Sequence, residues 1–296
     1  MPILPIAPPQ HVPTFSGFDY LTVDAPHRRV YAAHGGSQRL LIVDADTGAI
    51  TGQVRVGPMH GVAYDPKSGH VFTGNGTDES VSEVDPASLT VVRSVDVGGT
   101  VDAIVYDAAT SRIYADEDDG TRIFVIDAKT FTLLKTVNLP GHKPEYLAVD
   151  PQTHAVYQNI ANLSEIVVVD PQTLTVDRTI ATPELVSNHP LQYDETFHEI
   201  VVGGANGVLS VYDRDGRKKS TISVPAHIDQ CDLDQRTHAL ACAGGGGITV
   251  VRLSADGGAR VVGHVDVNPG VHTLAIDAKT ANIWTVWAAP DGSGDY

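Results

Sequence analysis

An aspartate with similar surroundings recurs seven times in 296 residues, and this repeat predicts an all-β, seven-bladed propeller with four antiparallel strands per blade. Consecutive copies are 40 to 44 residues apart: Asp24, Asp65, Asp107, Asp150, Asp194, Asp234 and Asp277. A period of this length with strand-like content is typical of propeller blades. No segment has a sustained 3.6-residue hydrophobic pattern, so we expect almost no helix.

The second repeat illustrates how each unit divides into four strands. Residues 61–64 are apolar and run into the turn sequence Asp-Pro-Lys-Ser-Gly at 65–69. Further strand-like runs follow at 71–73, 81–84 and 89–95. The first two runs are apolar, as expected for buried strands, and the fourth alternates, as expected for an outer strand.

The last unit predicts how the ring closes. It reaches Tyr296 after roughly two strands, and its outer strands must come from elsewhere. His11 to Phe15 aligns with the fourth strand of a unit. We therefore expect the N-terminal segment to complete the blade that holds Gly270 to Ala289, which removes a free sheet edge. No linker divides the chain, so residues 1–296 are predicted to form a single domain.

Several segments resemble the YVTN-type (YncE-like) β-propeller repeat family. They are Ala-Tyr-Asp-Pro-Lys-Ser-Gly-His-Val-Phe at 63–72, Ala-Val-Asp-Pro-Gln-Thr-His-Ala-Val-Tyr at 148–157, and Ile-Val-Asp-Ala-Asp-Thr-Gly at 42–48. The resemblance implies a propeller, and the family contains binding proteins, lyases and lactonase-like enzymes. Propellers of this kind are often exported, so we expect a periplasmic or secreted protein, with the cytoplasm as the alternative.

Composition limits the partners. The formal net charge of −16 disfavours binding to nucleic-acid phosphates. No apolar run is long enough to span a bilayer, and Met1 to Pro5 lacks the basic start of a signal peptide. We expect a monomer whose ligand is a small molecule. No Walker, Rossmann or Gly-x-Ser-x-Gly motif is present, so no organic cofactor is predicted.

The two cysteines lie in the sixth repeat. Cys231 and Cys242 are predicted to lie nearly opposite each other on neighbouring antiparallel strands. They could form a disulfide, or be two small core residues. We favour the second interpretation.

A second pattern points to a functional site. The residue five positions before each recurring aspartate is ionisable: Asp19, His60, Asp102, Glu145, His189, Asp229 and His272. This position begins the innermost strand of a blade, so the seven side chains should face one another at one mouth of the central channel. A solvated polar lining is the alternative.

The histidines in this ring predict a metal site. His60, His189 and His272 are spaced almost threefold around the ring, and three imidazoles can hold one divalent ion, whether Zn, Fe, Mn or Cu. Glu145 is expected to be the fourth ligand or the catalytic base. Asp19, Asp102 and Asp229 are further candidates for proton acceptors.

Other histidines surround the channel. His142, Lys143 and His227 lie closer to the loops and are expected to rim the entrance, where they would contact substrate. The following are predicted to be exposed, functionally silent turn residues on the opposite face: His70, His154, His198 and His238. His34 is predicted to end a second strand and to be a turn residue too.

Three function classes fit these features. The favoured class is a metal-dependent enzyme, a hydrolase of the lactonase type or a lyase, acting on a small molecule at the channel mouth. A non-catalytic protein that binds a metal or small ligand is the second. A protein-interaction scaffold is the third, although the chain has only six Phe and two Trp to form a contact surface.

Overall fold

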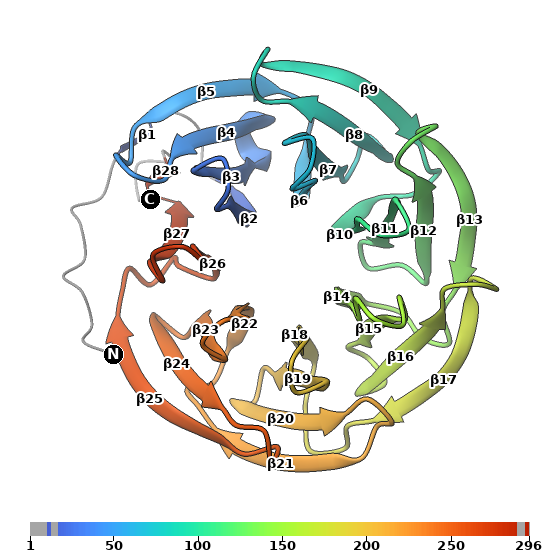
Figure 1. Ribbon diagram of the computed structural model, residues 1–296, viewed down its shortest axis with the longest axis vertical. Helices are drawn as coiled ribbons and strands as arrows, with labels where there is room; N and C mark the ends of the chain where they lie inside the picture. Colours follow the sequence, from blue (N-terminus) through green and yellow to red (C-terminus); the bar gives the residue numbers. More distant parts are fainter. Residues whose placement is uncertain (1–10, 13–16, 289–293, 296) are drawn as a thin grey trace.

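The chain folds into an all-β propeller of four-stranded antiparallel blades, as seen in the computed structural model (Figure 1). The structure describes residues 11–12, 17–288 and 294–295. Within these ranges the single helical element is the 3-10 turn η1 (Gly35–Ser37), so the expected scarcity of helix is confirmed. None of the described helices is long and apolar enough to cross a membrane.

Six blades are each formed by four consecutive strands. The first three blades contain β2 (Phe18–Asp24), β3 (Arg29–His34), β4 (Arg39–Asp44) and β5 (Ile50–Arg55); β6 (Met59–Tyr64), β7 (Val71–Asn75), β8 (Ser80–Asp85) and β9 (Thr90–Asp96); and β10 (Val101–Asp107), β11 (Arg112–Glu117), β12 (Arg122–Asp127) and β13 (Thr132–Asn138).

The next three blades have the same order from the channel outward. They contain β14 (Pro144–Val149), β15 (Val156–Ile160), β16 (Glu165–Asp170) and β17 (Thr175–Ala181); β18 (Asn188–Asp194), β19 (Glu199–Gly204), β20 (Val208–Asp213) and β21 (Lys218–Ser223); and β22 (Ile228–Asp234), β23 (Ala239–Gly244), β24 (Gly247–Leu253) and β25 (Ala259–Asp266).

The remaining sheet joins the two ends of the chain. Its order is β1-β28-β27-β26, with β26 (Thr273–Ile276), β27 (Ile283–Ala288), β28 (Gly294–Asp295) and β1 (His11–Val12). The N-terminal strand β1 is outermost, as predicted. The third strand of this sheet, β28, comes from the C-terminal residues, whereas we expected both missing strands to come from another part of the chain. The predicted pairing of residues 13–15 lies outside the described residues.

The recurring aspartates brace the turns between the first two strands of each blade. The Asp65 carboxylate, for example, accepts hydrogen bonds from the Lys67 amide at 3.0 Å and the Ser68 hydroxyl at 2.8 Å. Most of these aspartates are buried, so their role is structural, as expected for turns of this chemistry.

Four of these aspartates also hold neighbouring blades together. Each lies at ion-pair distance from a basic side chain of the next blade: Asp107 is 3.0 Å from His154, Asp150 is 2.9 Å from Arg214, Asp194 is 2.7 Å from His238, and Asp277 is 2.7 Å from Arg28. The Arg28–Asp277 pair joins the first complete blade to the sheet formed by the chain ends.

These contacts correct the prediction that the histidines of this face are exposed, whereas their lack of a functional role stays a prediction. His154 and His238 are half-buried and form two of the four inter-blade pairs. His70 lies 2.6 Å from Glu83, and His198 lies 3.2 Å from Arg214. Polar turn residues look solvent-facing in sequence, but here the turns of adjacent blades contact each other.

His34 is likewise a core residue rather than an exposed turn residue. It ends β3, is fully buried, and stacks on Phe18 with ring centroids 4.2 Å apart. The Ser37 hydroxyl lies 2.8 Å from its Nδ1 atom. A polar residue at a strand end was therefore misjudged because its packing partners are distant in sequence.

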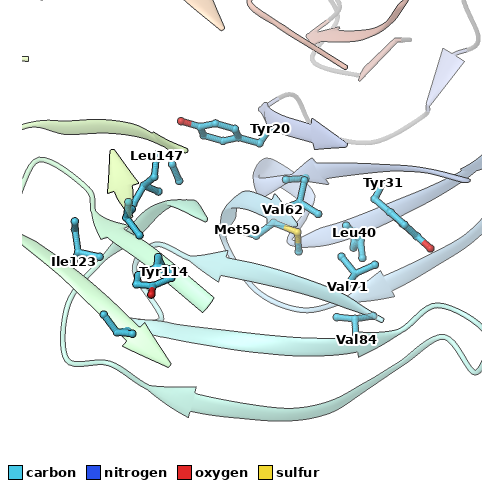
Figure 2. Packing of buried hydrophobic residues seen from close by; sticks show 14 of the residues in the cluster. Tyr20, Tyr31, Leu40, Met59, Val62, Val71, Val84, Tyr114, Ile123 and Leu147 are labelled. Atoms are coloured by element: carbon cyan, nitrogen blue, oxygen red, sulfur yellow. The ribbon is translucent and has the colours of Figure 1, made fainter. Parts of the chain in front are cut away.

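The hydrophobic core lies between blades. One cluster of buried side chains runs from the first to the fourth blade and includes Tyr31, Leu40, Val71 and Tyr114 (Figure 2). Each is fully buried, because the middle strands are covered by a blade on either side.

The two cysteines form a disulfide, contrary to the interpretation we favoured from the sequence. Cys231 on β22 and Cys242 on β23 are direct partners in the strand register, with Cα atoms 4.0 Å apart. Both are buried. The predicted facing of the two strands was correct, but only the actual register shows that the two sulfur atoms meet.

Replacing Arg28 by Ala should reduce the free energy of unfolding by about 3 kcal/mol, because it leaves the buried Asp277 carboxylate without its cation. Burial alone would raise the pKa of Asp277, but the hydrogen bond from Arg28 outweighs burial and holds this pKa below its usual value. The loss should therefore be full at neutral pH and shrink as the pH falls through that lowered pKa. Chemical denaturation measures it, with the exposed Arg55→Ala as control; equal effects of both variants would contradict the proposed role.

Removing residues 1–12 should lower the melting temperature, because β28 loses its neighbour and becomes a free edge. A loss of 1 kcal/mol corresponds to about 2–4 °C in a domain of this size class. Removing only residues 1–10 keeps β1 and is the matched control. Identical melting curves for the two truncations would show that β1 does not stabilise the propeller.

Candidate functional site

A β-bulge starts the innermost strand of each of the six complete blades. On β2, for example, Asp19 and Tyr20 together face the single residue Ala33 of β3, because the register shifts between Phe18 and Leu21. Bulges redirect side chains and are common beside functional sites. Here each bulge falls at or next to the ionisable ring position, and this explains how that position is turned to the channel mouth.

The first cluster at the mouth consists of Asp19, His60 and Asp102. His60 Nδ1 lies 2.7 Å from Asp19 Oδ2 and 3.8 Å from Asp102 Oδ1. The three side chains come from the first three blades and are all half-buried. Among the described residues, this is the one group of three His, Cys, Asp or Glu residues whose ligand atoms lie within 4.8 Å of one another.

The second cluster lies on the following blades and consists of Glu145, His189 and Asp229. His189 Nε2 is 3.1 Å from Glu145 Oε2 and also 3.1 Å from Asp229 Oδ1. Asn159 holds the His189 backbone, since its amide nitrogen donates to the His189 carbonyl at 2.8 Å. The other imidazole nitrogen, Nδ1, is buried and has no hydrogen-bond partner.

The ring therefore contains two carboxylate–imidazole–carboxylate clusters rather than the predicted set of three histidines. His60, His189 and His272 do not converge on one point, and the His272 imidazole lies 3.0 Å from the Gly270 carbonyl oxygen. Glu145 lies beside His189 and not beside His60. The histidines do not meet because carboxylates lie between them around the ring. His60 and His189 therefore each pair with the carboxylates of the adjacent blades.

Both paired histidines are favoured in their protonated form. The hydrogen bond to Asp19 raises the pKa of His60 to about 9. Burial alone would lower the pKa of His189, but the hydrogen bond to Glu145 and the charge of Asp229 outweigh burial and raise it to about 9. Burial raises the pKa of Asp229, and burial together with the Asp116 charge raises that of Asp102. The mouth thus has an excess of poorly solvated carboxylates.

Asp116 is a part of the site that the sequence analysis missed. It is fully buried on β11, and its carboxylate accepts hydrogen bonds from the Ala103 amide at 2.7 Å and the Gln158 side chain at 2.9 Å. Burial raises its pKa well above the usual value. A signal existed: nine residues after each recurring aspartate the other complete blades have Ala33, Gly74, Asn159, Gly203 and Ala243.

The predicted rim residues lie at the entrance but make few contacts. His142 and His227 are exposed. Lys143 Nζ lies 3.2 Å from Asp119 Oδ1, in the loop between β11 and β12. Their contact with a substrate stays a prediction.

Comparisons with known proteins establish the fold alone. No protein-family profile matches the sequence, and no curated protein matches it either. Among solved structures, hydrazine synthase of Kuenenia stuttgartiensis aligns with a TM-score of 0.78 and 14% identity over 93% of this chain and 96% of that chain. A chain in a mitotic checkpoint complex aligns with a TM-score of 0.81 and 12% identity over 97% and 89%. The neighbours thus include a synthase and a protein complex.

Replacing Glu145 by Gln should lower the pKa of His189 from about 9 toward the ordinary value of about 6.5, since it removes the stronger of its two acidic contacts. Any stability that this raised pKa contributes is complete below pH 6.5 and is lost as the pH rises through about 9. NMR titration of the imidazole in metal-free protein measures the shift. Asp19→Asn is the matched control, and a similar shift of His189 in both variants would contradict the separation into two clusters.

Proposed function

We propose that the channel mouth binds a divalent metal ion between Asp19, His60 and Asp102, and that the protein uses it as a metal-dependent hydrolase or lyase on a small molecule. The observation that carries the metal site is the convergence of these three side chains. Two ligand atoms of one tetrahedral ion lie about 3.4 Å apart. The spacings of 2.7 and 3.8 Å from His60 Nδ1 bracket that value.

The charge of the mouth supports a cation. Burial raises the pKa values of Asp102, Asp116 and Asp229, so the ionised form of each carboxylate is disfavoured there. A divalent ion would stabilise their ionised forms. Two carboxylates and one imidazole suit a first-row ion such as zinc, manganese or iron.

The second cluster would serve proton transfer. A divalent ion can polarise a carbonyl group or acidify a bound water. His189, held between Glu145 and Asp229 at 3.1 Å from each, is placed to receive or donate a proton in the same mouth. This assignment replaces the role of Glu145 as a metal ligand with that of a group that orients and charges His189.

The setting of the site supports a small substrate and an exported protein. The net charge of −16 disfavours polyanionic ligands, and the Cys231–Cys242 disulfide is typical of oxidising compartments. Membership of the YVTN-type repeat family and a monomeric state belong to the same proposal.

Replacing His60 by Ala should weaken binding of zinc or manganese by at least about 100-fold, because loss of a group that merely orients a ligand already costs about 10- to 100-fold. Titration calorimetry on untagged, chelator-treated protein measures it. His264→Ala, on the outer strand β25, is the matched control and should bind metal as the unmodified protein does. Unchanged affinity in His60→Ala would overturn the metal site.

A panel of lactones and esters then separates an enzyme from a binding protein. Two results would support catalysis: a chelator abolishes turnover, and Glu145→Gln reduces turnover while the metal content of that variant is unchanged. Metal binding without turnover of any substrate would favour the non-catalytic alternative.

A further inference from the structure

Two tyrosines lie directly behind the ring of ionisable residues. Tyr20 follows Asp19 on β2 and Tyr146 follows Glu145 on β14, and each lies in the bulge that starts its strand. They come from the first and fourth blades, yet their ring centroids are only 5.8 Å apart. The two rings therefore meet across the channel, immediately behind the mouth.

The hydroxyl groups of these tyrosines differ in their partners. The Tyr146 hydroxyl donates to the Cys231 carbonyl at 3.2 Å and accepts from the Gln192 side chain at 2.9 Å. The Tyr20 hydroxyl makes no hydrogen bond with any described residue, although Tyr20 is only 8% exposed. Figure 2 shows its ring projecting from β2 with the hydroxyl at the free end. A buried hydroxyl without a partner is unfavourable, so this position calls for a partner that the described chain does not supply.

The charges nearest in effect to the Tyr20 hydroxyl belong to the mouth. Burial raises the pKa of Tyr20 well above its usual value, and four carboxylates add to this rise, in decreasing order Asp102, Asp19, Asp116 and Glu145. The first two of these carboxylates are the ones that lie beside His60, at 3.8 and 2.7 Å. Tyr20 also packs in one hydrophobic cluster with Ala103, which follows Asp102 directly. The hydroxyl is therefore placed beside the proposed metal site.

Small residues on the neighbouring blades leave room for the Tyr20 ring. Gly61 and Ala103 occupy, on β6 and β10, the position that Tyr20 occupies on β2. A β-carbon on Gly61 would collide with the Asp102 carbonyl oxygen, so glycine is required where the second and third blades approach each other. Neither Gly61 nor Ala103 has a side chain that could hydrogen-bond the Tyr20 hydroxyl.

We propose that the Tyr20 hydroxyl donates a hydrogen bond to the substrate oxygen held at the metal ion, which makes Tyr20 a further catalytic residue of the channel mouth. This inference rests on the proposed metal site of Asp19, His60 and Asp102. The carbonyl oxygen of an ester or lactone takes on negative charge when water attacks the carbonyl carbon, and a fixed hydrogen-bond donor stabilises that charge. Ionised carboxylates cannot donate a hydrogen bond, whereas the hydroxyl of Tyr20 can. The proton stays on Tyr20, so no bond forms or breaks at this residue.

Acetohydroxamate tests the proposal, because it binds a divalent ion through two oxygen atoms, one of them a carbonyl oxygen. Titration calorimetry on untagged, zinc-loaded protein measures its affinity. Tyr20→Phe should weaken acetohydroxamate binding about tenfold or more, since a hydrogen bond to a charged oxygen is lost. The zinc affinity of this variant should be unchanged, and its melting temperature unchanged or higher, because the chain itself loses no hydrogen bond.

Tyr146→Phe is the matched control, since it is the same substitution at the same position of another blade. The Tyr146 hydroxyl is already bonded to Cys231 and Gln192, so this variant should bind acetohydroxamate normally and melt at a lower temperature. An equal loss of acetohydroxamate affinity in both variants would show that only the packing of the two rings matters. Unchanged affinity in Tyr20→Phe would show that its hydroxyl is merely solvated. Either result would overturn the role of Tyr20.

The same measurements separate this proposal from the metal site on which it rests. If the unmodified protein binds no zinc, both proposals fail. If it binds zinc but no acetohydroxamate, or binds acetohydroxamate as tightly as Tyr20→Phe does, the metal site stands and the role of Tyr20 alone fails. A loss of zinc affinity in Tyr20→Phe would make Tyr20 a metal ligand instead and would also overturn the proposed role.

Discussion

The propeller depends on the contacts that the carboxylate of the recurring aspartate makes with its own turn and with the next blade. This carboxylate accepts hydrogen bonds from the backbone of its own turn, and in four sheets it also lies at ion-pair distance from a basic side chain of the next blade. A blade has little helix or loop to cover it, so its faces are stable only against neighbouring blades. The Arg28–Asp277 pair extends the same contact across the junction of the chain ends, where β1 and β28 supply only short strands.

The bulge at the start of the innermost strand in each of the six complete blades shapes the wall of the channel. Because a bulge lets two successive residues face one partner, a ring residue and its successor both point inward. Asp19 and Tyr20 are one such pair, and Glu145 with Tyr146 is another. The same irregularity thus creates the charged mouth and the tyrosine pair behind it.

The two ends of the channel differ in chemistry. The mouth combines histidines with carboxylates whose pKa values are raised, and two imidazolium groups offset part of the charge. Deeper in the channel the wall is mostly apolar, and the Asp232 carboxylate in it accepts hydrogen bonds from the Leu233 and Ile276 amides. A metal ion suits the first environment better than the second, because a metal ion requires several oxygen or nitrogen ligands at once.

The sequence by itself determined the propeller class, the turn role of the aspartates and the identity of the seven ring residues, since these follow from a strict period. Only the tertiary structure decided which of them meet. His60 lies with Asp19 and Asp102, and His189 with Glu145 and Asp229, because side-chain pairing depends on distances between blades that no repeat spacing encodes. The register between the first and second strands of a blade likewise decided two further features. It places Asp116 opposite the bulge of β10, and it brings the sulfur atoms of Cys231 and Cys242 together.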